Sequence, residues 1–405
     1  MDNVTHALAG CLLAAATIEI VRRSSSEPTP AFRRAAYFLG VVAAEFPDVD
    51  LVYAGERMGM GGLGYLLHHR GHTHTVLFAL ASALFLWGLA LAVRCGLRTR
   101  ELARPLLGLC LVGTLSHVLL DYTNSYGVHP WWPVDNRWIY GDAVFIVEPW
   151  FWVAALPPLL LASRSLASRV FFGLLLVAIL MAAWRVDMVG EKVALALTIG
   201  AALWAALTWA APVSRRVTMG LALWTGLEVM FFAASAAGRS AVVAEVGLTL
   251  RDVVLTPSAG NPFCLSALAV TEDGGAYNVS TAIVAPFPGI RSANACSRAP
   301  RGVVDGMPPG RADSPAIRWG AMWTGEVSEL REMARTNCQV AAALQFIRVP
   351  VWRRLASGGA ELSDLRFGDG GGGFASIVAA PPAAPCPRYV PGWKWPRGDL
   401  LSRSP

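Results

Sequence analysis

Long apolar segments separated by short polar connections occupy the first 238 residues of the chain. Eight such runs can be delimited, at residues 7–21, 35–54, 75–93, 105–120, 144–162, 170–184, 193–211 and 217–237. Most approach the roughly 20 residues that a membrane-spanning helix requires, although the first and sixth are short. The pattern therefore predicts a mainly α-helical, polytopic membrane bundle of about eight spans over residues 1–238.

The character of the chain changes after Gly238. Glycine and proline become more frequent, and the apolar runs shorten to the length of β-strands, as at 253–255, 282–285 and 376–379. One longer helical stretch is expected at 326–346. These features predict a soluble α+β domain over residues 239–380, followed by a proline-rich, extended tail over residues 381–405.

The composition agrees with a membrane protein. The mean hydropathy is +0.46, and only 15% of the residues are charged, against about 25% in a typical soluble domain. The net charge of +6 does not indicate nucleic-acid binding, because the arginines lie at the ends of apolar runs rather than in one patch. A cleavable signal peptide is not expected, since Asp2 and His6 precede the first apolar run and no basic residue does.

Arginines mark alternate connections between the runs. They occur within 22–34, 94–104, 164–169 and 215–216, whereas the other connections are nearly balanced in charge. Under the positive-inside rule the arginine-rich connections are cytoplasmic. The amino terminus, the connections at 55–74 and 122–143 and the carboxy-terminal domain then face outward, in a multi-pass protein of the cell (inner) membrane.

The cysteines divide between the two parts of the chain. Cys11, Cys95 and Cys110 lie in or beside apolar runs, where a thiol behaves as a small hydrophobic group. The soluble part contains four, which are Cys264, Cys296, Cys338 and Cys386. An even number in an outward-facing domain predicts two disulfides, whose pairing the sequence leaves open. No CxxC spacing occurs, so a structural zinc site is a poor interpretation of these cysteines.

Histidines and aspartates are the candidate functional residues of the chain. All seven histidines precede residue 130. Six of them, with three acids, fall in short polar motifs: His6; Asp48 and Asp50; His68, His69, His72 and His74; His117 and Asp121. Imidazoles and carboxylates are costly in lipid and persist there mostly for function. Together they are the ligand types of a divalent metal such as zinc or manganese.

Each motif also has a structural interpretation. His117 and Asp121 are four residues apart on one helical face, which suits a shared ion or a buried hydrogen-bonded pair. Asp48 and Asp50 end an apolar run and are also typical of helix capping. The cluster at 68–74 surrounds Gly71, so its imidazoles can converge, and Thr73 can orient a ligand; a solvated loop is the alternative. His68 and His72 individually fit ligands, substrate contacts or bystanders.

A polar and aromatic stretch follows His117 and extends to Trp150. Its aromatic side chains suit a membrane interface. Asn124 is a candidate donor to an oxyanion or phosphate, and Asp142 or Glu148 is a candidate general base or additional ligand. A structural contact within the connection is the alternative for each of the three.

These motifs resemble those of the membrane-bound metal-dependent hydrolase family (YdjM-type). The resemblance rests on Thr5-His6, Pro47-Asp48-Val49-Asp50, His69-Arg70-Gly71-His72-Thr73-His74 and Ser116-His117 with Asp121. It continues through 124–127 and 148–150 and, less specifically, through 256–263 and 363–367. Some members have a histidine after the second acid, where this chain has Leu51. The pattern is also similar, as a fold-level analogy, to zinc-dependent phospholipase C, a helical phosphoesterase with a metal cluster.

The combined hypothesis is a membrane-embedded metal-dependent hydrolase. Its expected metal ligands are His6, Asp48, His69, His74, His117 and Asp121. Six ligands exceed the three plus water that one catalytic zinc uses, and they suffice for two ions bridged by a carboxylate. One or two divalent ions are therefore expected, with Zn²⁺ favoured over Mn²⁺.

The remaining polar residues receive roles around that centre. Asp50, Asp142 and Glu148 are candidate general bases, and Arg70 is expected to offset charge on the transition state. His72, Asn124 and Asp142 are expected to contact the substrate. A phosphoester such as a lipid or lipid-linked phosphate is the substrate class that suits a site at the membrane surface, with membrane lipids as partners and no nucleic acid.

Two other classes of protein compete with this hypothesis. A metal-binding transporter or sensor would need ionisable residues deep in several spans of both halves. The later runs offer only Glu148 and Glu228 and no histidine, which favours a site at the membrane surface. A structural scaffold with an incidental ion would require the candidate ligands to lie far apart.

Overall fold

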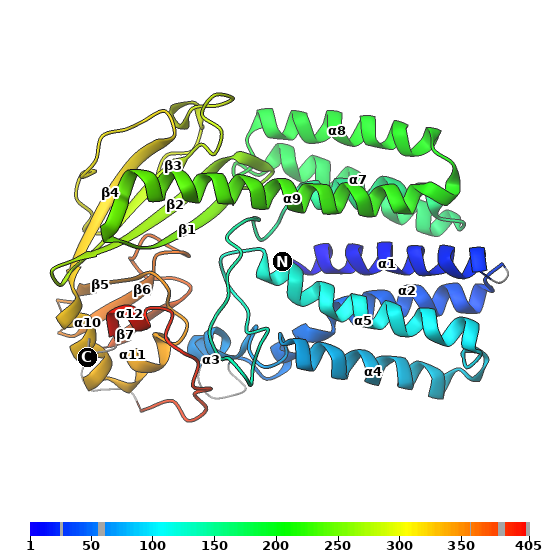
Figure 1. Ribbon diagram of the computed structural model, residues 1–405, viewed down its shortest axis with the longest axis horizontal. Helices are drawn as coiled ribbons and strands as arrows, with labels where there is room; N and C mark the ends of the chain where they lie inside the picture. The colour runs from blue at the N-terminus through cyan, green and yellow to red at the C-terminus, as the bar shows by residue number, and fades with distance from the viewer. Residues whose placement is uncertain (25–26, 56–60, 357, 380–384, 402–405) are drawn as a thin grey trace.

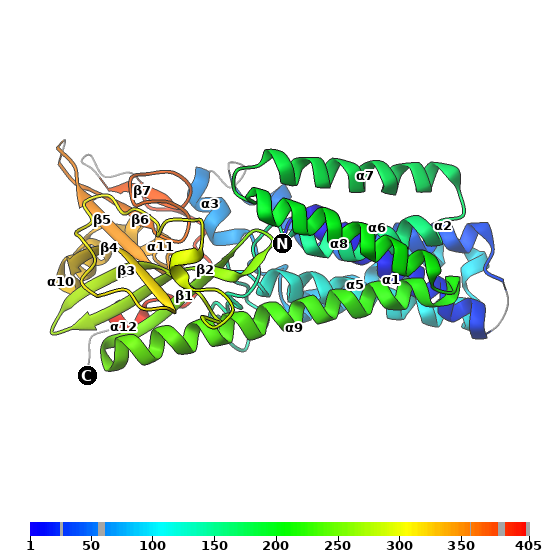
Figure 2. The same ribbon diagram turned by 90° about the horizontal axis from the view of Figure 1, so that it is seen from above.

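The protein consists of a bundle of long helices with a β-rich domain at one end. The computed structural model describes residues 1–24, 27–55, 61–356, 358–379 and 385–401. The long helices lie side by side, and two sheets gather beyond one end of the bundle (Figures 1 and 2). The amino terminus lies at this same end of the bundle, facing the sheets (Figure 1).

Among the described residues, six helices are long and apolar enough to cross a membrane. These are α1 (Asn3–Ser24), α4 (Val76–Val93), α5 (Arg100–Tyr122), α7 (Leu166–Arg185), α8 (Glu191–Ala210) and α9 (Val213–Val246). Two shorter helices, α2 (Pro30–Glu45) and α6 (Pro149–Ala162), have 16 and 14 residues. The expected mainly helical membrane bundle is confirmed, whereas the count of eight spans is not.

Local chemistry explains the two short helices. Pro47 lacks an N–H group and crowds the preceding turn, so the apolar run 35–54 leaves α2 at Glu45 and continues as the 3-10 helix η1 (Phe46–Val52). In the run 144–162, the Glu148 carboxylate accepts a hydrogen bond from the Trp150 N–H and so caps α6. Both runs thus contain a segment outside the α-helix, at the end of the bundle that faces the sheets.

The arginine-rich connections gather at the opposite end of the bundle. The chain turns there between α1 and α2, between α4 and α5, between α6 and α7, and between α8 and α9 (Figure 1). The alternation that the arginine pattern predicts is therefore preserved, because α2 and α6 run alongside the longer helices although they are shorter.

Small residues bring α1, α2 and α5 into close contact. A Cβ atom added at Gly10 of α1 would lie 2.4 Å from the carbonyl oxygen of Gly40 in α2. A Cβ added at Gly113 of α5 would lie 2.8 Å from the Ala43 side chain. Close backbone approach through small residues is characteristic of helix packing in membranes. It fixes the three helices that bear or precede His6, Asp48 and His117.

The soluble part has two antiparallel sheets. The first has the order β1-β2-β3-β4, and the second has the order β5-β6-β7. The strands are β1 (Leu250–Ser258), β2 (Asn261–Asp273), β3 (Ala276–Val284), β4 (Ile317–Glu326), β5 (Pro350–Arg354), β6 (Ala360–Asp364) and β7 (Ser376–Ala379). Val254 pairs with Leu268, and Ala269 pairs with Ser280. The three expected apolar runs thus contribute to β1, β3 and β7.

The helical elements of this part differ in detail from the expectation. The stretch 326–346 forms two helices, α10 (Val327–Thr336) and α11 (Cys338–Ala343), which Asn337 separates by capping α11. The helix α9 passes the expected boundary at residue 238 and ends at Val246, packed on the sheet through contacts such as Val242 with Leu255. In the tail, α12 (Gly398–Leu401) follows an extended stretch.

The expected disulfides are present in the soluble part. Cys264 is bonded to Cys296, and Cys338 is bonded to Cys386. The second bridge ties the start of α11 to the tail, so the tail is held against the domain. Cys11, Cys95 and Cys110 have free thiols. Two bridges match the number expected from the cysteine content, and the structure supplies the pairing that the sequence left open.

Candidate metal centre

Four separate segments bring the candidate ligands to the end of the bundle that faces the sheets. His6 lies in the first turns of α1, and Asp48 and Asp50 lie in η1. The histidine cluster lies between α3 (Gly61–His68) and α4, and His117 and Asp121 lie in the last turns of α5. Because these helix ends meet, residues more than 100 positions apart become neighbours (Figure 1).

The tightest group consists of Asp48, His74, His117 and Asp121. One ligand atom from each lies within 4.8 Å of all the others. His74 Nε2 lies 3.0 Å from Asp121 Oδ2, 3.3 Å from Asp48 Oδ1 and 3.1 Å from His117 Nε2. His117 Nε2 lies 3.4 Å from Asp48 Oδ1 and 3.5 Å from Asp121 Oδ2.

These five separations, 3.0–3.5 Å, are close to the edge length of a coordination tetrahedron. An ion with bonds of about 2.0–2.1 Å holds tetrahedral ligand atoms about 3.3–3.4 Å apart. Asp121 Oδ2 is also buried without a hydrogen-bond donor among the described residues. Two imidazole nitrogens and two carboxylate oxygens are a donor set that zinc and manganese accept. The residues of this group therefore fit a divalent metal ion.

Outer hydrogen bonds orient both imidazoles of the group. The Nδ1 atom of His117 lies 2.5 Å from the Ala44 carbonyl oxygen, which can only accept, so Nδ1 carries the proton and Nε2 is free to bind an ion. The Nδ1 atom of His74 lies 3.0 Å from Thr73 Oγ1 and 3.3 Å from Asp50 Oδ2. Such partners fix the ring orientation and the tautomer of metal-binding histidines.

A second group shares Asp48 with the first. It consists of Asp48, Asp50 and His69. His69 Nδ1 lies 3.0 Å from Asp50 Oδ1, while Asp50 Oδ2 accepts hydrogen bonds from Arg70 N at 3.0 Å and Thr73 Oγ1 at 2.8 Å. Burial alone would raise the pKa of the Asp50 carboxyl, but hydrogen bonds from His69 and His74 hold this pKa below its usual range.

The contacts of Asp50, predicted as a candidate general base, are those of a residue that orients its neighbours. The carboxylate is fully buried and holds the loop that contains His69, Arg70, Thr73 and His74. A carboxylate with this many donors and a lowered pKa is a weak proton acceptor. Asp50 therefore orients the histidine-containing loop, and it is also a member of the second group of candidate ligands.

His6 lies beside the first group without belonging to it. Its ring stacks on the His117 ring with the centroids 3.8 Å apart, and its Nε2 lies 3.3 Å from Asp121 Oδ1. The amino group of Met1 contacts the same carboxylate oxygen. The Nδ1 atom of His6 is buried and has no hydrogen-bond partner in the part of the chain that the structure describes. His6, predicted as a metal ligand, thus contacts the group but is not one of its four converging residues.

Arg70 places a positive charge against the group. Its Nη2 lies 3.0 Å from Asp121 Oδ1, and its Nη1 donates to Asn124 Oδ1 at 3.0 Å. The guanidinium carbon lies 4.7 Å from the centre of the Tyr126 ring. Asn124 is held in turn by the Tyr126 N–H. Arg70 and Asn124, predicted to act on transition-state charge and on substrate, are therefore together beside the candidate centre.

Three other predicted residues have their contacts outside the two groups of candidate ligands. Glu148 accepts hydrogen bonds from Trp150 N at 3.2 Å and Gly260 N at 3.1 Å, and burial raises its pKa to about 8 despite these bonds. Asp142 binds arginines of α9 and of the soluble domain. The ring of His72 lies 4.7 Å from those of Trp132 and Trp393. None of the three belongs to either group of candidate ligands described here.

Two residues at the open edge of the centre were not predicted. The Asn3 side-chain amide donates to Glu45 Oε2 at 3.0 Å and to Asp48 Oδ2 at 3.4 Å. Glu45 lies one helical turn before Asp48. Its position could have indicated a functional role, because an acidic residue within an apolar run is costly and is usually functional. Asn3 gave no signal in the sequence. The two residues form the solvent-facing side of Asp48.

The fold and the site define a multi-pass membrane protein with a His/Asp cluster that can hold a metal ion. Residues 1–190 match the family model described as YdjM inner membrane protein. The match includes α1 to α7, and therefore every residue of both ligand groups. No curated protein and no solved structure matches the chain.

Proposed function

We propose that this protein is a membrane-embedded metal-dependent hydrolase whose centre is formed by Asp48, His74, His117 and Asp121. The observation that carries the proposal is the tetrahedral spacing of four donor atoms from three segments of the bundle. The burial of His117 and Asp121 within the bundle carries a free-energy cost, which a bound divalent ion would offset. Zinc is the first candidate, with manganese as the alternative.

An open coordination position is what separates a catalytic from a structural site. Four protein ligands close the coordination of a structural zinc, whereas catalytic sites use three and water. The side chain of Asp48 is 13% exposed while those of His74 and Asp121 are 0% and 1% exposed, so Asp48 faces the accessible side. Asp48 also belongs to the second group with His69, so it is the residue that two ions would share if each group held one.

The surrounding residues suit an anionic substrate. A divalent ion in such a centre supplies Lewis acidity and activated water for the hydrolysis of an ester. Arg70 and Asn124 provide a guanidinium and an amide beside Asp121, and a guanidinium pairs well with phosphate oxygens. A phosphoester is therefore the favoured substrate class. The position at the end of a membrane bundle favours a lipid or lipid-linked phosphate.

The arginine-rich connections lie at the far end of the bundle from this centre. Under the positive-inside rule, this arrangement supports an orientation in which the centre and the soluble domain face outward. Single cysteines introduced near residues 100 and 166 should then be labelled from the cytoplasm, and one near residue 300 from outside. Labelling of the soluble domain from the cytoplasm would overturn the orientation and leave the metal centre untouched.

The test of hydrolysis uses purified protein and a panel of phosphoesters. Protein loaded with Zn²⁺ or Mn²⁺ should hydrolyse a phosphatidic acid or a polyprenyl phosphate, and a chelator should abolish the reaction. Asp121→Asn should reduce kcat by at least 100-fold, while His68→Ala should retain it, because His68 contacts the Tyr389 carbonyl and lies in neither group. Metal binding without hydrolysis of any phosphoester would favour a metal-binding transporter, sensor or structural site.

A further inference from the structure

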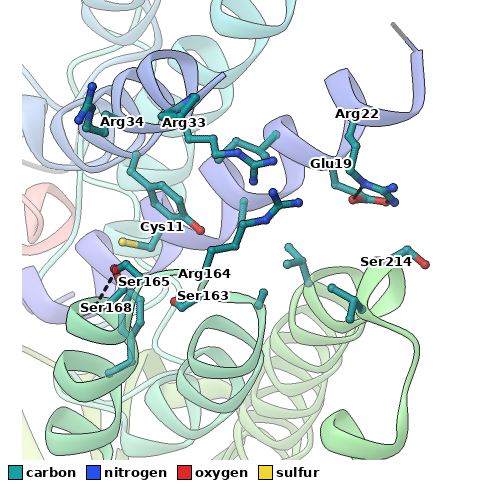
Figure 3. A pocket seen from close by; sticks show the side chains of 18 residues that line it. Cys11, Glu19, Arg22, Arg33, Arg34, Ser163, Arg164, Ser165, Ser168 and Ser214 are labelled. Atoms are coloured by element: carbon teal, nitrogen blue, oxygen red, sulfur yellow. Dashed lines mark hydrogen bonds and ion pairs between the residues drawn. The ribbon is translucent and has the colours of Figure 1, made fainter. Parts of the chain in front are cut away.

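A cavity lies at the end of the bundle that is opposite the candidate metal centre. It has a volume of about 580 Å³ and lies between α1 and α2 on one side and α6, α7 and α9 on the other (Figure 3). Its position separates it from the candidate metal centre, whose residues do not line it. The proposed hydrolase does not use this cavity.

The lining of this cavity is strongly basic. Four arginines line it, which are Arg22, Arg33, Arg34 and Arg164, against a single acid, Glu19. Arg33 and Arg164 come from opposite halves of the bundle and reach toward each other across the cavity (Figure 3). Both contact one carboxylate, that of Glu27.

The acids near the cavity are too few to neutralise the arginines. Glu19 is shared by Arg22 and Arg23, each at 2.7 Å. Arg34 pairs with no acid among the described residues. Like charges held this close repel, so an anion placed between them is stabilised by several guanidinium groups at once.

The floor of the cavity is apolar. It is formed by Ala15 and Ile18 of α1, Phe172 of α7 and Val217 of α9. All three helices are candidate membrane spans, and 17% and 28% of the most apolar windows of α7 and α9 are buried within the protein. The lipid phase would therefore surround α7 and α9 beside this floor. A soluble anion would leave the apolar surface unused.

We propose that this cavity binds an anionic phospholipid, whose phosphate takes the place of the exposed Glu27 carboxylate on Arg33 and Arg164. An acyl chain then lies along Ile18, Phe172 and Val217. The cavity lies at the level of the arginine-rich connections, where the lipid head groups are found. Basic pockets between membrane helices on this side suit anionic head groups. Ser163 and Ser165, which also line the cavity, add hydroxyl groups within the same polar rim. The proposal does not depend on hydrolysis at the metal centre.

The experiment measures lipid retention by native mass spectrometry of the full-length protein in detergent. Delipidated protein is titrated with phosphatidylglycerol, phosphatidylcholine and inorganic phosphate. Wild-type protein should retain phosphatidylglycerol and release phosphatidylcholine. The Arg33→Gln, Arg164→Gln double variant should bind phosphatidylglycerol at least tenfold more weakly, since two charge-assisted contacts are lost.

Two further variants separate this cavity from general attraction to a basic surface. Arg94→Gln with Arg100→Gln removes two exposed arginines from the same end outside the cavity, and should retain the lipid. Ala162→Phe narrows the cavity while keeping every charge, and should weaken retention. Equal retention by the double variant at Arg33 and Arg164, unchanged retention by Ala162→Phe, or displacement of the lipid by millimolar inorganic phosphate would each overturn the proposal.

Discussion

A buried ion network joins the helical bundle to the soluble domain and allows a quantitative test. Arg348 places Nη1 2.9 Å from Asp142 Oδ1 and Nη2 3.0 Å from Asp142 Oδ2. Its Nε lies 2.8 Å from Asp252 Oδ2. Asp142 comes from the connection between α5 and α6, and Asp252 comes from β1, so Arg348 ties the two parts together.

The cost of removing Arg348 follows from the burial of its partners. The side chains of Arg348 and Asp142 are 6% and 0% exposed, and breaking a buried pair typically costs about 3–5 kcal/mol. Asp142 keeps Arg239 at 2.8 Å, and Asp252 is 15% exposed. We therefore expect Arg348→Met to destabilise the soluble domain by about 3 kcal/mol, which corresponds to a Tm lower by about 6–12 °C.

Tryptophan fluorescence during thermal unfolding provides the assay. The control is Arg354→Met, which removes an exposed arginine whose pair with Glu329 should contribute little. Adding Asp142→Asn to Arg348→Met should cost less than Asp142→Asn costs alone, because the two residues share one interaction. A Tm change for Arg348→Met no larger than that of the control would refute the assigned role of the network.

Three further predictions concern the pH dependence, the helix packing and the disulfides. Burial would raise the pKa of Asp252, but the charge and hydrogen bonds of Arg348 contribute most to lowering this pKa from 3.8 to about 2. The resulting stabilisation of the folded state is full above pH 4 and is lost as the pH falls toward 2. The free energy of unfolding of the domain should therefore fall over this pH range, and the fall should be smaller in Arg348→Met. Gly10→Val should lower both the thermal stability and the metal content, because the new side chain disrupts the contact with Gly40. Gly88→Val is the control, since a Cβ atom at Gly88 meets no atom within 4 Å. Unchanged thermal stability of Gly10→Val would contradict the close packing. Alkylation of the native soluble domain should modify none of its four cysteines before reduction, and modification of all four would contradict the two bridges.

The sequence predicted the elements more reliably than their ends. Apolar length identified the helices, because the need to satisfy backbone groups in lipid leaves few alternatives. The count of eight spans is not confirmed, because Pro47 and the cap at Glu148 shorten the α-helix within two of the apolar runs. Those are local effects, and the hydropathy of a window averages over them.

Some contacts of the candidate site could be predicted from the sequence, and others could not. His117 and Asp121 could be paired from their spacing of four residues on one helix, and the structure brings both into one group. Asp142 and Glu148 could not be assigned, because the partners that occupy them, Arg348 and Gly260, lie more than 100 residues further along the chain. Short polar motifs show which polar residues need a partner to offset the cost of their burial. Only the fold decides whether that partner is a charged group, a backbone group or an ion.

The most direct test of the proposed centre is the metal content of the purified protein. Inductively coupled plasma mass spectrometry should find at least one equivalent of zinc or manganese per wild-type chain. His117→Ala should lose most of that metal, because it removes one of four converging donor atoms, while His68→Ala should retain it. Full metal content in His117→Ala, or a wild-type protein that binds neither metal when loaded with it, would contradict the central claim.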